Sequence, residues 1–194
     1  MKEKIKVIFL DIDGVLNSAY TWNESISSDG IFLDEEKFKY LKKIYDNNHC
    51  LIVLSSSWRK YFIRDGNSIV AQGRMGKLLD LMLNKYGMFI FDMTPKFGSR
   101  EDEIVGWLVS HRGEVNSFLI LDDSVNNNFV YNDNVIHTLW NDIDRSKCGL
   151  LESDIEKAND ILSKKTKIKY NFKIKRMVNN LNNQVNLTGF GRRF

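Results

Sequence analysis

Short apolar runs alternate along the first 163 residues with longer stretches in which apolar residues recur every three or four positions. The short runs have the length of buried strands, and the longer stretches have the spacing of amphipathic helices. This alternation is typical of a parallel sheet whose strands are joined by crossover helices. The predicted strands are residues 5–10, 51–54, 88–91, 118–121 and 135–139.

Helix-start signals precede two of the longer stretches. Asp34 is placed to cap the first helix, which has two Glu residues in its first turn, and Ser99 begins a capping sequence ahead of the third. The predicted helices are residues 34–48, 75–86, 100–111 and 153–163, and Trp107 and Trp140 are predicted to pack the helices against the sheet. Five strands and four helices predict a three-layer α/β/α, Rossmann-like domain over residues 1–163.

Two stretches interrupt the alternation. Residues 18–33 are polar without a clear period, and we expect a loop there that forms a flap over a site. Residues 164–194 are Asn-rich, basic and weakly amphipathic, and we expect them to form an arm outside the domain.

The composition limits the class of protein. A chain of 194 residues with 43% hydrophobic residues can bury one core. No apolar run approaches the roughly 20 residues needed to span a bilayer, and the run at residues 5–10 is interrupted by Lys6, so neither a membrane span nor a secretory leader is expected. Cys50 and Cys148 could form at most one disulfide, which fits a cytoplasmic location.

Charge is distributed unevenly. Residues 161–194 hold nine of the 28 basic residues and no acidic one, which leaves 19 basic and 25 acidic residues in residues 1–160. A basic arm interleaved with Tyr170 and Phe172 suits RNA or DNA, although a solubilising terminus or a surface for an acidic protein fits equally well. The nine basic residues are Lys164, Lys165, Lys167, Lys169, Lys173, Lys175, Arg176, Arg192 and Arg193.

Acidic residues follow two of the predicted strands. Asp11 and Asp13 come after the first strand, and Asp122 and Asp123 come after the fourth. Because the carboxyl ends of parallel strands meet at one edge of the sheet, we expect the four carboxylates to lie close together. Such a cluster repels itself without a cation, and a site built only from oxygen ligands favours Mg²⁺.

Each of these signals is weak alone, because an Asp-x-Asp-Gly sequence is most often a turn and an Asp-Asp pair is often a helix cap. Their coincidence, with serines at the end of the second strand between them, favours a site. Gly14 allows a sharp turn and lets backbone amides approach an anion.

These residues resemble the motifs of the haloacid dehalogenase-like (HAD) phosphohydrolase superfamily over residues 5–163. Asp11 and Asp13 match the first motif, Ser55 the second, and the pair at 122 and 123 the fourth. The sequence is more narrowly similar to the phosphatase domain of "Swiss Army Knife" RNA repair proteins, in Ser56-Ser57-Trp58-Arg59, Arg100-Glu101-Asp102-Glu103-Ile104, Trp107-Leu108, Leu121-Asp122-Asp123 and Gly149-Leu150.

The resemblance implies roles for individual residues. Asp11 would attack phosphorus to form an aspartyl-phosphate, and Asp13 would protonate the leaving alcohol and then activate water. Mg²⁺ would be held by the Asp11 carboxylate, the Asp13 carbonyl and Asp123, with Asp122 as a further ligand or a close partner. Ser55 would hydrogen-bond a phosphoryl oxygen.

Substrate contacts are further expected from Ser56, Gly14 and Arg59, while Trp58 is expected to anchor the core. The cation of the third motif is either Arg100 or Lys96. A basic residue at a helix N-terminus opposes the helix dipole, which favours a functional reason for the arginine.

Substrate size is suggested by the lack of room for a large cap domain in residues 17–50 and 58–88. An essentially capless site would admit the end of a polymer, so the favoured function is a Mg²⁺-dependent phosphomonoesterase acting on terminal phosphates of RNA or DNA, aided by the arm at 164–194. The alternatives are a phosphatase of nucleotides or other small esters, and a binding protein for nucleic acid or an assembly with little turnover. Retention of Asp11 and Asp13 argues against the last.

Overall fold

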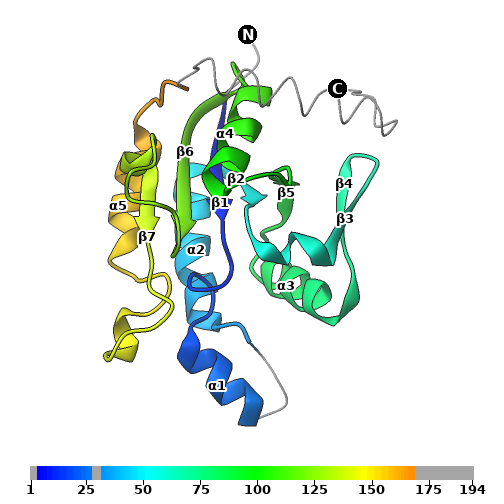
Figure 1. Cartoon of the computed structure of the whole chain (residues 1–194), viewed down its shortest axis with the longest axis vertical. Coiled ribbons are helices and arrows are strands. Elements are labelled where there is room, and N and C mark those ends of the chain that lie inside the picture. The colour runs from blue at the N-terminus through cyan, green and yellow to red at the C-terminus, as the bar shows by residue number, and fades with distance from the viewer. Residues whose placement is uncertain (1–3, 28–31, 169–194) are drawn as a thin grey trace.

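The computed structural model describes residues 4–27 and 32–168, in which a five-stranded parallel sheet forms the centre (Figure 1). The strand order β5-β2-β1-β6-β7 is that of a doubly wound, Rossmann-like sheet and confirms the predicted fold class. The bounds are β1 Ile5–Leu10, β2 Cys50–Leu54, β5 Ile90–Met93, β6 Val115–Asp122 and β7 Val135–His137.

Helices cover both faces of this sheet. Helices α2 (Glu35–Asn48), α3 (Gly73–Lys85) and α5 (Asp154–Ser163) contribute to the core on one face, and α4 (Arg100–Ser110) covers the other (Figure 1). The four predicted helices are therefore present, and Asp34 and Ser99 accept hydrogen bonds from backbone amides as N-caps of α2 and α4. The result is the expected three-layer arrangement.

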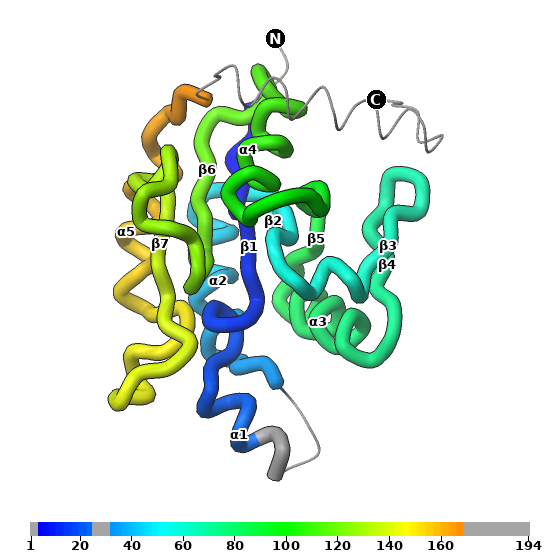
Figure 2. Tube along the Cα trace, viewed as in Figure 1, coloured from blue at the N-terminus to red at the C-terminus, as the bar shows by residue number. Residues whose placement is uncertain are grey.

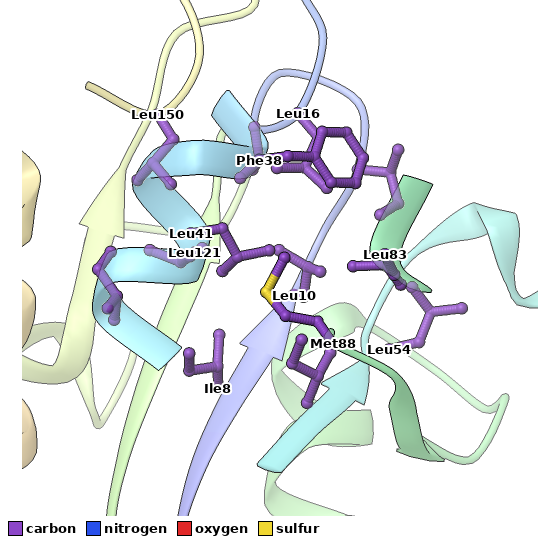
Figure 3. Packing of buried hydrophobic residues seen from close by; sticks show 14 of the residues in the cluster. Ile8, Leu10, Leu16, Phe38, Leu41, Leu54, Leu83, Met88, Leu121 and Leu150 are labelled. Carbon is purple, nitrogen blue, oxygen red and sulfur yellow. The ribbon is translucent and has the colours of Figure 1, made fainter. Parts of the chain in front are cut away.

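The two faces of β1 explain its continuous apolar sequence. Ile8 and Leu10 pack with side chains of α2 and α3, as Figure 3 shows, whereas Phe9 faces α4. The ring of Phe9 meets Trp107 edge to face at a centroid distance of 5.3 Å, which confirms that Trp107 packs its helix on the sheet. Burial on both faces holds β1 rigid, so the residues that follow it are held rigidly as well.

A helix occupies much of the segment expected to be a loop. Helix α1 (Ala19–Ser27) lies beyond the carboxyl ends of β1 and β6 (Figure 1). The prediction of a loop over 18–33 was wrong for these residues, because the sequence there has no regular apolar face. The helix is held instead by contacts with the chain after β7, including a hydrogen bond from the Tyr20 hydroxyl to the Asp142 carbonyl at 2.7 Å.

A hairpin between β2 and α3 was also not predicted. It consists of β3 (Phe62–Asp65) and β4 (Ser68–Ala71), and it stands at the side of the sheet in Figure 2. Gly66 lies at the turn with a φ of 57°, a conformation that favours glycine. The two-residue turn Gly66-Asn67 between the two strands is a recognised hairpin signal, so this element was detectable from the sequence.

Only the first predicted strand has the observed bounds. The second begins one residue earlier than predicted, and the fourth covers residues 115–122 rather than 118–121. The third covers residues 90–93 rather than 88–91. The Met88 amide donates to the Leu83 carbonyl, so Met88 belongs to the turn that follows α3 and not to the strand. The fifth ends at His137. Trp140 therefore lies beyond the sheet, half-buried beside Asp13 and Asp123, and the prediction that it packs helices against the sheet was wrong.

The first residues of the basic arm still contact the domain. The Thr166 amide donates to the Asn116 carbonyl at 2.9 Å, and Ile168 packs against the core on the α4 side. This contact lies at the amino end of β6, opposite Asp122. The remainder of the predicted arm, 169–194, lies outside the described residues.

Within the described ranges, no helix is both long enough and apolar enough to cross a membrane. Cys50 and Cys148 are buried and free, so they do not form the one disulfide that the sequence allowed.

Candidate active site

Three strand ends bring the predicted site residues to one edge of the sheet. The register pairs Leu10 with Leu54 on one side and with Leu121 on the other, so β1, β2 and β6 end level with each other. The next residues are Asp11, Ser55 and Asp122. This edge includes the point between β1 and β6 where the strand order reverses, which is where doubly wound folds bind ligands.

Asp11 is almost completely buried, with 4% of its surface exposed. One carboxylate oxygen accepts the Ile12 amide at 2.8 Å, and the other lies 3.0 Å from the Arg100 guanidinium. Burial raises the pKa of Asp11 to about 6; Arg100 and a hydrogen bond from the Ser56 hydroxyl oppose this shift, and the negative charge of Asp122 adds to it. The effect of burial on the pKa of Asp11 therefore outweighs that of the neighbouring arginine.

Of the two candidates for the third-motif cation, Arg100 is the one that reaches these carboxylates. It lies in the first turn of α4, and a single nitrogen, Nη1, contacts Asp11, the Ser55 carbonyl and Asp122, the last at 2.6 Å. Burial alone would lower the pKa of Arg100, but the two carboxylates raise it. Lys96 is exposed on the preceding loop, so the geometry favours Arg100 for the role that the sequence left open.

Asp122 and Asp123 are adjacent but differ in their surroundings. One Asp122 oxygen accepts the Ser124 amide and hydroxyl, both at 2.9 Å, and the Val125 amide at 3.2 Å, while the other accepts Arg100. Asp123 is only half-buried, and burial together with Asp122 raises its pKa. Because both oxygens of Asp122 are already engaged, Asp123 is the better placed of the pair to bind a ligand.

Gly14 allows Asp123 to approach the loop after β1. A Cβ atom at position 14 would lie 2.6 Å from the Asp123 carboxyl carbon, and the glycine has a φ of +77°. Both features exclude a larger side chain. The Gly14 amide donates to the Asn17 side chain at 3.0 Å, a contact that closes the turn. The approach of backbone amides to an anion at this turn stays a prediction.

The donor set fits a divalent cation. Asp11, Asp122 and Asp123 each offer a carboxylate oxygen within 4.8 Å of the others. The raised pKa values of Asp11 and Asp123 reflect burial together with repulsion from Asp122, which a bound cation would relieve. Hard oxygen ligands without sulfur or imidazole match Mg²⁺.

Asp13 is held by two hydrogen bonds that orient its carboxylate. The Trp58 indole donates to one oxygen at 2.9 Å, and the Asn17 side-chain amide donates to the other at 2.9 Å. Trp58 is buried, as expected for a core anchor, and its indole N–H also positions Asp13. Asn17 was not predicted as a site residue, although its place three residues after Gly14 in a tight turn could have suggested it.

The two serines after β2 differ in their hydrogen bonding. Within the described part of the chain, the buried Ser55 hydroxyl has no hydrogen-bond partner. A buried hydroxyl without a partner is costly, so its presence here fits a ligand oxygen. The Ser56 hydroxyl contacts Asp11 and accepts the Trp58 amide at 3.3 Å, so it supports Asp11.

Arg59 is engaged with the protein at each of its side-chain nitrogens. It donates to the Ser56 carbonyl at 2.8 Å, to the Thr94 and Pro95 carbonyls, and to Glu103 of α4 at 2.6 Å. These contacts join the β2 loop to α4 and so help to place Arg100. The contact with substrate that the sequence predicted for Arg59 stays a prediction.

A small cavity opens beside the carboxylates. It has a volume of about 290 Å³ and is lined by Asp13, Asp123, Trp22 of α1 and Trp140. Neither tryptophan was predicted as a site residue, because their segments are far apart in the sequence and meet only through the docking of α1.

The strand order, the aspartates after β1 and β6 and the arginine at the start of α4 together define a HAD-like hydrolase. A family model for the HAD domain in Swiss Army Knife RNA repair proteins matches residues 7–154, and the chain belongs to this family. Comparison with curated proteins and with solved structures gave no significant match.

Proposed function

We propose that the protein is a Mg²⁺-dependent phosphomonoesterase that removes terminal phosphates from RNA or DNA. The observation that carries the proposal is the buried Asp11 carboxylate at the carboxyl end of β1, 3.0 Å from Arg100 and within a cluster of carboxylates suited to a divalent cation. The relation to RNA repair proteins supports nucleic acid as the substrate.

In the first step, an Asp11 oxygen forms a bond to phosphorus while the bond from phosphorus to the leaving alcohol breaks. Asp13 donates its proton to the leaving oxygen. The hydrogen bonds from Trp58 and Asn17 fix the orientation of its carboxyl group. Arg100 and the Ser55 hydroxyl stabilise the negative charge on the phosphoryl oxygens. The product is an aspartyl-phosphate on Asp11.

In the second step, the Asp13 carboxylate removes a proton from water, and the water oxygen bonds to phosphorus as the bond to Asp11 breaks. Inorganic phosphate leaves, and both aspartates return to their starting forms. Asp11, Asp123 and the Asp13 carbonyl would hold Mg²⁺, which supplies positive charge to the phosphoryl oxygens.

The size of the elements near the site supports a polymer end as the substrate. Helix α1, inserted after the first motif, has nine residues, and the hairpin after β2 has two four-residue strands. Such short insertions leave room for a strand of nucleic acid to continue beyond the terminal nucleotide.

The function is tested by phosphate release from matched 3′- and 5′-phosphorylated oligonucleotides and from mononucleotides, with and without Mg²⁺. We expect Mg²⁺-dependent release, faster from one oligonucleotide end than from the mononucleotides. Equal or faster turnover of mononucleotides would indicate a nucleotide phosphatase, and a lack of release over a broad range of metals and pH would indicate a binding protein.

Replacing Trp58 by Phe should affect substrates according to their leaving groups. Phe fills the same buried site but lacks the N–H that bonds Asp13. Because Asp13 protonates the leaving oxygen, we expect kcat to fall about tenfold or more for a phosphorylated oligonucleotide and much less for 4-nitrophenyl phosphate, whose leaving group needs little protonation. Equal losses on both substrates would mean that Trp58 acts only through packing.

The basic arm is proposed to bind the nucleic-acid backbone. Removal of 169–194 deletes six basic residues and keeps Thr166 and Ile168, which contact the domain at the end of β6 opposite the catalytic edge. We expect weaker binding of oligonucleotides and a flatter dependence of log kcat/KM on log salt, because fewer counterions are released. Activity on 4-nitrophenyl phosphate should stay unchanged, and an equal loss on both substrates would contradict this role.

A further inference from the structure

Helix α1 is tied to the chain that follows β7. The Ala19 amide donates to the Trp140 carbonyl at 2.9 Å, and the Tyr20 hydroxyl donates to the Asp142 carbonyl at 2.7 Å. Arg145 pairs with Glu24 on the exposed side of the same contact, with a second hydrogen bond at 3.0 Å. These bonds bring two segments more than a hundred residues apart together at the mouth of the active site.

The docking places two tryptophans around one cavity. Trp22 projects from α1 with 41% of its surface exposed, and its ring lies against Phe32 at a centroid distance of 4.6 Å. Trp140 lies on the segment that accepts the first turn of α1. Trp22, Trp140, Asp13 and Asp123 line an open pocket of about 290 Å³, close to the lower limit of about 300 Å³ for small-ligand sites.

The proposed role of Asp13 indicates which part of the substrate would lie beside this cavity. A general acid must lie beside the leaving oxygen, so the remainder of the leaving group must lie on the Asp13 side of the phosphorus. For a terminal phosphate of nucleic acid, that remainder is a nucleoside. The aromatic surfaces on that side belong to Trp22 and Trp140, and planar rings of this kind stack on nucleobases of any sequence.

We propose that Trp22 and Trp140 bind the base of the terminal nucleotide and so determine specificity for nucleotide-bearing phosphate esters. This inference rests on the proposed function for its substrate class. In this proposal, α1 contributes Trp22 to one side of the base site.

The test compares two oligonucleotides with the same terminal phosphate, one with a normal terminal nucleotide and one with an abasic terminal nucleotide. For Trp140→Ala and Trp22→Ala, we expect kcat/KM to fall about tenfold or more on the base-bearing strand and to change less than about twofold on the abasic strand. Trp140→Phe should recover most of the activity. Phe89→Ala, which removes an exposed aromatic ring at the amino end of β5, is the matched control and should change neither rate.

A binding measurement makes the test independent of turnover. In Asp11→Asn, the base-bearing strand should quench tryptophan fluorescence more strongly than the abasic strand, and the quenching should decrease in Trp22→Ala and Trp140→Ala backgrounds. If the wild type hydrolyses neither strand but this quenching is seen, the phosphatase function fails and the base site stands. The base site is overturned if both strands are hydrolysed and the tryptophan variants lose kcat/KM equally on both. It is also overturned if the quenching is the same for the base-bearing and the abasic strand.

Discussion

Asp11→Asn should abolish phosphate release and at the same time stabilise the metal-free protein. Without a nucleophilic carboxylate the aspartyl-phosphate cannot form, so we expect kcat to fall by a factor on the order of 10⁴ or more. The stabilisation has a different cause. Burial first, and the neighbouring Asp122 in addition, raise the pKa of Asp11 to about 6, so its charged form is disfavoured in the folded protein at pH 7. A neutral amide removes this penalty, which is on the order of 1–3 kcal/mol.

Thermal unfolding with and without Mg²⁺ measures this effect. In the absence of metal at pH 7, the variant should melt several degrees above the wild type. The Asp11 carboxyl of the folded wild type becomes protonated as the pH falls from about 6 toward 4. The free-energy cost of burying its charge should therefore shrink over that range, and the difference in melting temperature between the two proteins should shrink with it. Mg²⁺ should raise the melting temperature of the wild type more than that of the variant. A variant that melts below the metal-free wild type at pH 7, or that retains Mg²⁺-dependent hydrolysis, would contradict the assignment.

Arg100→Gln should cost both stability and activity. Asp122 is fully buried and its only cationic contact among the described residues is Arg100, so the variant leaves a buried carboxylate without a counterion. Breaking a buried pair in this way destabilises proteins by about 3–5 kcal/mol. Loss of a charged donor to the phosphoryl oxygens should lower kcat by about 10²–10³.

A second substitution separates the two losses. In Arg100→Gln combined with Asp122→Asn, the unpaired charge at position 122 is removed and only the Asp11 carboxylate lacks its cation, so we expect part of the stability to return while activity stays low. Lys96→Ala is the matched control, because it removes an exposed cation near the same helix and should leave kcat within about twofold, as exposed residues without such contacts tolerate substitution. Loss of activity in Lys96→Ala, with an active Arg100→Gln, would reverse the choice between the two cations.

The catalytic edge was largely predictable because its residues follow strands directly. Asp11 and Asp122 come after apolar runs that are buried on both faces, so their position depends on strand ends that the sequence marks clearly. The choice between Arg100 and Lys96 was not predictable, because both lie near the start of the same helix and only the packing of α4 decides which one reaches the carboxylates.

Contacts between distant segments account for the remaining differences. Arg59 was predicted to contact the substrate, which stays a prediction, and the sequence did not indicate that its guanidinium also bonds Thr94, Pro95 and Glu103. Trp140 was expected to pack a helix against the sheet. Instead, β7 ends three residues before it, and its carbonyl accepts a hydrogen bond from the first residue of α1. Neither outcome is encoded in local periodicity or residue type.

The sequence by itself determined the strand-helix alternation, the parallel sheet and the cluster of aspartates at its carboxyl edge, because hydrophobic period and strand ends are local properties of the chain. Only the tertiary structure decided that Arg100 neutralises Asp11 and Asp122, that Trp58 and Asn17 aim Asp13, and that two tryptophans line a cavity beside it. Those arrangements depend on which surfaces pack together after the elements have formed. Side-chain contacts of this kind leave no regular pattern in the sequence.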